Sequence, residues 1–175
     1  MTDLRLLAEL PAGLVEATRD LLDRSFAGGF GDDDWDHARG GLHAVLVEGD
    51  AVLAHAAVVP RELRIDGSWQ HCGYLEAVAT DPALRRRGQG SQVVEALGDV
   101  IRDRDHLGVL STGAHRFYAQ LGWERWRGTT WVLEGDGAHR TADEDDGIMV
   151  LRTARSVDLP LDGELVCRAR CGDDW

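Results

Sequence analysis

The residues whose types and spacing point most directly to chemistry form the segment Arg85-Arg86-Arg87-Gly88-Gln89-Gly90-Ser91. It precedes an amphipathic helix predicted from the apolar spacing of residues 93–101. The first turn of a helix has unpaired N–H groups and a partial positive charge. Glycines let a ligand approach the backbone, and arginines add fork-shaped donors. The segment therefore predicts a pyrophosphate site, with a solvated basic turn as the alternative. Its Gly-x-Gly spacing does not fit the dinucleotide-binding fingerprint.

The overall charge makes this arginine run stand out. The 175 residues include 31 Asp plus Glu against 19 cationic side chains, a formal net charge of −12, and every one of those cations is arginine. The absence of lysine excludes a lysine Schiff base and a P-loop lysine. The negative charge argues against a nucleic-acid partner and fits a cationic one better, although surplus acid is most often a solubility device.

The elements that must position the arginine segment follow from the hydrophobic period. The strands before it form an antiparallel meander, with a type I′ hairpin turn at Asp66-Gly67. After it, helical and strand patterns alternate, which predicts an α/β (α+β) fold with a mixed sheet. The predicted strands are residues 3–10, 42–47, 51–59, 61–65, 70–80, 107–110, 123–133, 148–151 and 165–168; the predicted helices begin at residues 11, 89 and 115; the predicted loops are residues 25–31 and 135–147.

Neither a metal site nor a membrane segment is expected. The three cysteines, Cys72, Cys167 and Cys171, are an odd number, which favours free thiols in a reducing cytoplasm. Zinc is not expected, because the last two cysteines lack a second ligand pair. The longest apolar stretch, residues 51–59, is far too short to span a bilayer, and the N-terminus lacks the apolar core of a signal peptide. Four histidines are interpreted as structural: His37, His43, His55 and His71.

Two motifs carry a resemblance to a known family. Arg85 to Gly90, following Leu75-Glu76-Ala77-Val78-Ala79-Thr80, resembles the coenzyme A motif of the GNAT superfamily of N-acetyltransferases. The segment Arg116-Phe117-Tyr118-Ala119-Gln120-Leu121-Gly122-Trp123 is similar to the Phe-Tyr-x-x-x-Gly-aromatic segment after that fold's fifth strand. The resemblance implies a mixed, mostly antiparallel central sheet flanked by helices.

Further segments along nearly the whole chain resemble the aminoglycoside 2′-N-acetyltransferases of that superfamily. This resemblance implies one domain over residues 1–175, whose tail, residues 162–175, contributes to the substrate site. It also implies direct acetyl transfer, in a ternary complex, from acetyl-coenzyme A to the 2′-amine of kanamycin B, tobramycin or gentamicin-type drugs. Such a reaction would give antibiotic resistance. A homodimer is a further implied property. The segments are Asp34-Trp35, Gly40 to Ala44, Ala54 to Val58, Cys72 to Glu76, Asp145 to Gly147 and Gly172 to Trp175.

Residue roles follow from the same resemblance. Glu76 is implied to accept a proton through water, and Tyr118 to act as general acid on the leaving thiolate. The alternatives are a strand carboxylate in a salt bridge and a core tyrosine. The backbone N–H of Val78 is implied to polarise the acetyl carbonyl. The implied coenzyme-binding residues are Val78, Thr80, Arg85, Arg86, Arg87, Gly88, Gly90 and Ser91.

Acidic residues are implied to bind the ammonium groups of the drug. They occur in three separated clusters, residues 32–36, 143–146 and 173–175, which would converge on one cleft. Each acid taken alone fits a solvated surface group, and the terminal tryptophan fits a frayed tail. Gly29 stands where related enzymes have an aspartate, so the drug spectrum stays open. The implied substrate-binding residues are Asp34, Glu76, Ser111, Asp145, Asp173 and Trp175.

Two other hypotheses remain open. One is a GNAT enzyme that acetylates another polyamine or a metabolite amine. The other is a non-catalytic acidic protein that binds cationic drugs or coenzyme A; the joint presence of Glu76, Tyr118 and the arginine–glycine segment argues against it.

Overall fold

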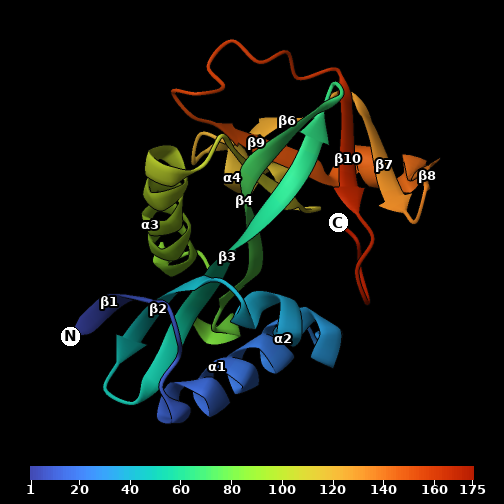
Figure 1. Cartoon of the computed structure of the whole chain (residues 1–175). Helices are drawn as coiled ribbons and strands as arrows, with labels where there is room; N and C mark the ends of the chain where they lie inside the picture. The colour runs from blue at the N-terminus through green and yellow to red at the C-terminus, as the bar shows by residue number, and fades with distance from the viewer. The chain divides into compact units, whose positions relative to one another are not determined.

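The computed structural model describes all 175 residues, Met1 to Trp175, and they form two compact units. The first unit is Met1–Val59 with Leu75–Asp99, and the second is Pro60–Tyr74 with Val100–Trp175. Two long strands, β3 (Ala51–Ile65) and β4 (Ser68–Thr80), contribute residues to both units, as does the helix α3 (Gln89–Arg104) (Figure 1). None of the helices is both long and apolar enough to cross a membrane.

The first unit is built on an antiparallel sheet of β1 (Thr2–Leu7), β2 (Leu42–Glu48) and the beginning of β3. The helices α1 (Ala12–Ser25) and α2 (Asp32–Arg39) lie between β1 and β2 in the chain. Apolar residues of α1 and α2 pack with residues of β2, β3 and β4 in one core cluster, which includes Leu21, Leu22, Trp35 and Val45. Burial of this cluster is what holds the two helices to the strands.

The second unit contains a larger mixed sheet in the order β6-β9-β5-β4-β3-β10-β7-β8. The pairs β4–β5 and β7–β10 are parallel and the other pairs described are antiparallel. Its core cluster includes Tyr74, Trp126, Val150, Leu165 and the terminal residue Trp175. Its elements are β5 (Leu107–Ser111), α4 (His115–Ala119), β6 (Glu124–Arg125), β7 (Thr129–Glu134), β8 (Gly137–Arg140), the 3-10 helix η2 (Ala142–Gly147), β9 (Ile148–Arg152) and β10 (Glu164–Arg168).

Most predicted elements are confirmed. The mixed α/β sheet is present, and the buried residues of α3 include the apolar face predicted for it, with Val93, Val94, Leu97 and Ile101. Asp66 and Gly67 have φ angles of 46° and 89°, which confirms the type I′ turn between β3 and β4. The predicted loop at residues 25–31 and the predicted stop of α4 before Gly122, whose φ is 87°, are also confirmed.

Three local predictions were wrong. Residues 51–65 form one strand rather than two. Pro60 lies between the part of β3 that pairs with β2, which reaches Val58, and the part that pairs with β10 at Arg64 and Ile65. The predicted strand 123–133 is two strands, β6 and β7, which pair with different partners. They separate at Gly128, where a Cβ would lie 1.8 Å from the carbonyl oxygen of Gly163. The predicted loop 135–147 contains β8 and η2. The acidic cluster near residue 34, for which the sequence pattern predicts no element, lies in the helix α2.

Candidate functional site

The predicted pyrophosphate segment opens α3 in the first unit. The first intrahelical bond that spans the start of α3 runs from Gln92 N to Gly88 O at 3.2 Å, so the N–H groups of Gln89, Gly90 and Ser91 have no acceptor within the helix. Arg86 and Gly88 have φ angles of 65° and 84°. Left-handed residues in such a turn point successive N–H groups to one side, which makes an anion-binding concavity.

Three arginines precede these backbone donors in the chain. Arg85, Arg86 and Arg87 are exposed, and Arg85 donates to the carbonyl oxygen of Ser25 at 3.2 Å. Just before the segment, Asp81 is in an ion pair with Arg24 at 2.9 Å. Hydrogen bonds from the Ala83 N–H and from Arg24 lower the pKa of Asp81, so this carboxylate is ionised and already neutralised by a partner. The donor set that remains, backbone N–H groups and guanidinium groups, fits a pyrophosphate.

A backbone irregularity lies in β4 between two of the predicted site residues. Ala77 has a φ of 52°, in the left-handed region that a residue with a Cβ avoids. Glu76 and Val78 flank it, and both are half-buried, as is Thr80 further along the strand. A residue of this conformation breaks the regular strand geometry and redirects its neighbours. Sequence patterning could not reveal it, because no glycine marks the position.

Tyr118 lies on α4 in the second unit. Its side chain is buried between the rings of Phe117 and Trp123, whose centroids lie 4.9 Å and 6.2 Å from its own in edge-to-face arrangements. Burial raises the pKa of the Tyr118 phenol above its ordinary value of 10. The hydroxyl is therefore protonated throughout the neutral range and can donate a hydrogen bond. A higher pKa makes it a better persistent donor and a weaker acid.

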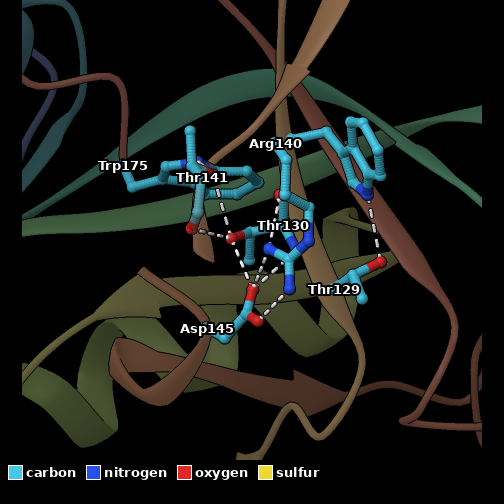
Figure 2. A network of polar contacts seen from close by, with 7 residues as sticks. Thr129, Thr130, Arg140, Thr141, Asp145 and Trp175 are labelled. Carbon is cyan, nitrogen blue, oxygen red and sulfur yellow. Dashed lines mark hydrogen bonds and ion pairs between the residues drawn. The ribbon is translucent and has the colours of Figure 1, made fainter. Parts of the chain in front are cut away.

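Asp145 is the centre of a polar network in the second unit, shown in Figure 2. Its carboxylate accepts two hydrogen bonds from Arg140, one of them 2.7 Å long from Nη1 to Oδ1. It also accepts from the backbone N–H of Thr130, and the Thr130 hydroxyl lies 2.8 Å from the same carboxylate. The hydrogen bonds from Arg140 are the largest cause that lowers the pKa of Asp145. An internal cation therefore already balances this carboxylate.

The last residue is anchored rather than frayed. Trp175 is 8% exposed, and its indole Nε1–H donates to Thr141 Oγ1 at 3.1 Å (Figure 2). Arg61 donates to the carbonyl oxygen of Asp174 at 2.8 Å, and Arg170 donates to that of Asp173 at 2.7 Å. These bonds leave the Asp173 side chain exposed. Hydrogen bonds to its backbone thus hold the tail in place, and the Asp173 carboxylate is exposed to solvent.

Two of the three predicted acidic clusters come together within the second unit. Glu144 has a raised pKa, caused first by burial and then by the negative charges of Asp173, Asp143 and Asp174. These charges lie close enough to repel one another, which concentrates negative potential at this place. Ser111, exposed at the end of β5, lies beside the same 3-10 helix, since its Oγ would be 3.0 Å from a Cβ at Gly147.

The third cluster, on α2 in the first unit, is partly engaged. The Asp34 carboxylate accepts the N–H of Gly31 at 2.7 Å and so caps the helix. Asp32 is in an ion pair with Arg19 at 2.8 Å. The Asp34 side chain is half-buried. Nowhere in the chain do three or more His, Cys, Asp or Glu side chains form a group that could hold a metal ion.

Comparisons with known proteins agree with this fold. The model of the acetyltransferase (GNAT) family matches residues 13–123, and the chain therefore belongs to the GNAT acetyltransferase family. It is 39% identical over 164 residues to the aminoglycoside 2′-N-acetyltransferase of Mycolicibacterium fortuitum, covering 91% of this chain and 84% of that protein. The chain is thus an acetyl-CoA-dependent N-acetyltransferase related to that enzyme.

Solved structures share the fold at low sequence identity. The GNAT N-acetyltransferase YhbS of Escherichia coli, solved with CoA, has a TM-score of 0.72 and 18% identity, covering 98% of this chain and 93% of that one. A GNAT acetyltransferase of Brucella melitensis, solved with acetyl-CoA, has a TM-score of 0.62 and 18% identity, covering 94% of each chain. These likenesses confirm the fold class predicted from the motifs.

Proposed function

We propose that this acetyltransferase transfers the acetyl group of acetyl-CoA to the 2′-amine of aminoglycosides and so inactivates these antibiotics. The observation that carries the proposal is the 39% identity over 91% of the chain to an aminoglycoside 2′-N-acetyltransferase. The concentrated carboxylates at Asp143, Glu144, Asp173 and Asp174 support it, because aminoglycosides carry several ammonium groups. Carboxylates would pair with the ammonium groups of any polyamine. The choice of aminoglycosides as the substrate class therefore rests on the identity to the aminoglycoside 2′-N-acetyltransferase.

The coenzyme would be held by the start of α3. Its pyrophosphate would accept hydrogen bonds from the N–H groups of Gln89, Gly90 and Ser91, with charge balance from Arg86 and Arg87. Gly88 allows the close approach, and Val78 and Thr80 would contact the coenzyme from β4. The bound thioester supplies an activated acetyl group.

The protein's own residues would then position and move protons. Glu76 would accept the proton of the substrate ammonium through water, and the Val78 N–H would donate to the acetyl carbonyl oxygen as it gains negative charge. The left-handed residue between them supports this assignment, because it frees β4 from regular strand geometry at that point. Tyr118 would act as the acid on the departing sulfur. Because burial raises the pKa of its phenol, it would stabilise the thiolate mainly by donating a hydrogen bond.

Substrate contacts are proposed for Asp34, Ser111, Asp173 and the Trp175 carboxylate, with Glu76 contacting the reacting amine. Asp145 belongs to the same proposal in a different way. Its charge is balanced by Arg140, so we assign it to holding η2 and β7 in place as much as to binding an ammonium group. A single domain over residues 1–175, a cytoplasmic location and a homodimer remain predictions.

A direct assay tests the proposal. Purified protein, acetyl-CoA and tobramycin are mixed, thiol release is followed, and the acetylated carbon of the product is identified by NMR. We expect release with tobramycin and acetylation at 2′. Amikacin, which has a hydroxyl at 2′, is the matched control and should give no 2′ product. Release with other polyamines but not with any 2′-amino aminoglycoside would make the chain a different amine acetyltransferase, and binding without release would make it a non-catalytic binder.

A further inference from the structure

Two buried histidines lie side by side on neighbouring strands of the first unit. His43 on β2 and His55 on β3 are 1% and 0% exposed. His43 Nδ1 lies 2.9 Å from His55 Nε2, and His55 Nδ1 lies 2.8 Å from the carbonyl oxygen of Ala77. The sequence alone indicates only that both are structural residues. In the structure they form a continuous hydrogen-bonded chain that ends on the one left-handed residue of β4.

The protonation of this chain is determined by its end. A carbonyl oxygen can only accept, so His55 must carry its proton on Nδ1. Burial lowers the pKa of His55 to about 3, so the ring is neutral and its Nε2 is an acceptor. His43 must then donate from its own Nδ1. The hydrogen bonds therefore run in one direction, from His43 to His55 to Ala77, and the His55 ring has a defined tautomer.

Ala77 needs such a partner. A non-glycine residue with a φ of 52° is strained, and strain of this kind persists only where the surroundings hold it. The Ala77 side chain packs against the core cluster of the first unit, and its carbonyl oxygen accepts from His55. Together these contacts fix the peptide planes on both sides of the residue. Those planes set the direction of the Glu76 side chain and of the Val78 N–H.

We propose that His55 is a positioning residue for acetyl transfer, with His43 holding the His55 ring through its Nε2. The chain His43–His55–Ala77 holds the irregularity of β4 in the one conformation that aims Glu76 and the Val78 N–H correctly. The proposal rests on the roles given to these two groups under the proposed function. It assigns His55 no contact with substrate or coenzyme and no proton transfer.

A matched pair of substitutions tests this at His55. In His55→Asn the side-chain NH₂ lies where Nδ1 lay and can still donate to Ala77. In His55→Gln the amide lies at the Nε2 side and the donor to Ala77 is lost. We expect kcat of His55→Gln to fall roughly ten- to a hundredfold, as for a displaced reacting group, with KM values near those of the wild type. His55→Asn should recover most of kcat, although both variants lose the same ring.

Equal impairment of His55→Asn and His55→Gln, or wild-type kcat in His55→Gln, would overturn the proposal. If either variant fails to fold, the same comparison moves to His43, which lines a cavity of about 260 Å³ with Trp35 and Arg39. His43→Asn keeps the donor to His55 and should retain kcat, whereas His43→Leu removes it and should not.

A spectroscopic measurement separates this proposal from the proposed function. Long-range ¹H–¹⁵N correlation of the imidazole rings at neutral pH should show both histidines as Nδ1–H tautomers, and it needs no activity. The Nε2–H tautomer for His55 would contradict the hydrogen-bonded chain even in an active enzyme. If both rings carry the proton on Nδ1 but the protein is inactive on every 2′-amino aminoglycoside, the proposed substrate is contradicted. The hydrogen-bonded chain of histidines is then still supported.

Discussion

The indole of Trp175 and the hydroxyl of Thr141 join the end of the chain to the network around Asp145. Trp175 Nε1 donates to Thr141 Oγ1 at 3.1 Å, and Thr141 Oγ1 lies 2.9 Å from Thr130 Oγ1. Thr130 Oγ1 in turn lies 2.8 Å from Asp145 Oδ1. The bonds can all run toward the carboxylate, where each strengthens the next. The position of the Trp175 indole is therefore coupled to β7 and to Asp145 in η2.

Removing the indole should loosen the tail. For Trp175→Ala we expect the free energy of unfolding in urea to fall by about 3 kcal/mol, because a buried aromatic side chain is lost from the core. The KM for tobramycin should rise several-fold more than the KM for acetyl-CoA. Val157→Ala is the control, since that side chain is 61% exposed and should change neither quantity. A stable variant with an unchanged tobramycin KM would remove Trp175 from the substrate site.

Asp145→Asn should act mainly on stability. It leaves the Arg140 guanidinium without its counter-charge, so we expect a loss of about 2 kcal/mol at neutral pH. Arg140 lowers the pKa of Asp145, so this contribution is present above pH 3.8 and is lost as pH falls through the lower value in the folded protein. The difference between wild type and variant should therefore shrink on acidification. Asp146→Asn, at an exposed pair with Arg125, is the control and should cost little.

Tyr118→Phe should lower kcat by about a hundredfold with little change in either KM, as expected on loss of a group acting on the leaving sulfur. Burial raises the Tyr118 pKa, so the wild-type kcat should not fall as the pH approaches 10 through ionisation of this residue. Steady-state rates in thiol-release assays across this range measure both effects. Equal kcat for the two proteins would take the acid role away from Tyr118.

Asp34→Asn separates charge from structure. The amide oxygen can still cap α2 by accepting the Gly31 N–H, so folding should be preserved. We expect the KM for tobramycin to rise several-fold at low ionic strength and the difference from wild type to narrow as salt is added. Asp50→Asn, in the exposed turn between β2 and β3, serves as the control. A salt-independent difference would argue against an ionic contact between Asp34 and the drug.

The neutral state of His55 also predicts a pH dependence of stability. Its pKa is about 3 in the folded protein and 6.5 without burial. The unfolded chain therefore binds a proton that the folded protein rejects, so stability is full above pH 6.5 and falls as the pH drops from there toward 3. His55→Asn lacks this group, and its urea-unfolding free energy should fall less over the same interval. Parallel curves for the two proteins would show that His55 is not neutral in the folded state.

The sequence by itself determined the acetyltransferase motifs, the arginine–glycine segment at the start of α3 and most strands and helices, because these depend on local features. Gly88 and the arginines before it adjoin a helix start, and the Asp66-Gly67 turn is specified by two adjacent residues. It also indicated that acids near residues 145 and 173 would converge. Local signals were weaker where they failed: the helix α2 is rich in aspartate, and β8 is short and polar.

The tertiary structure alone decided how these residues are used. In the sequence Asp145 is one of several neighbouring acids with nothing to distinguish it. In the structure it forms an ion pair with Arg140, which lies on β8, a strand that the sequence did not predict. His43 and His55 are twelve residues apart and meet only because β2 and β3 pair in one register. Ala77 has a left-handed backbone conformation, although no glycine in the sequence indicates one at this position. In each case the deciding interaction joins residues distant in the chain, and the energy of such contacts exceeds the local preferences that a sequence displays.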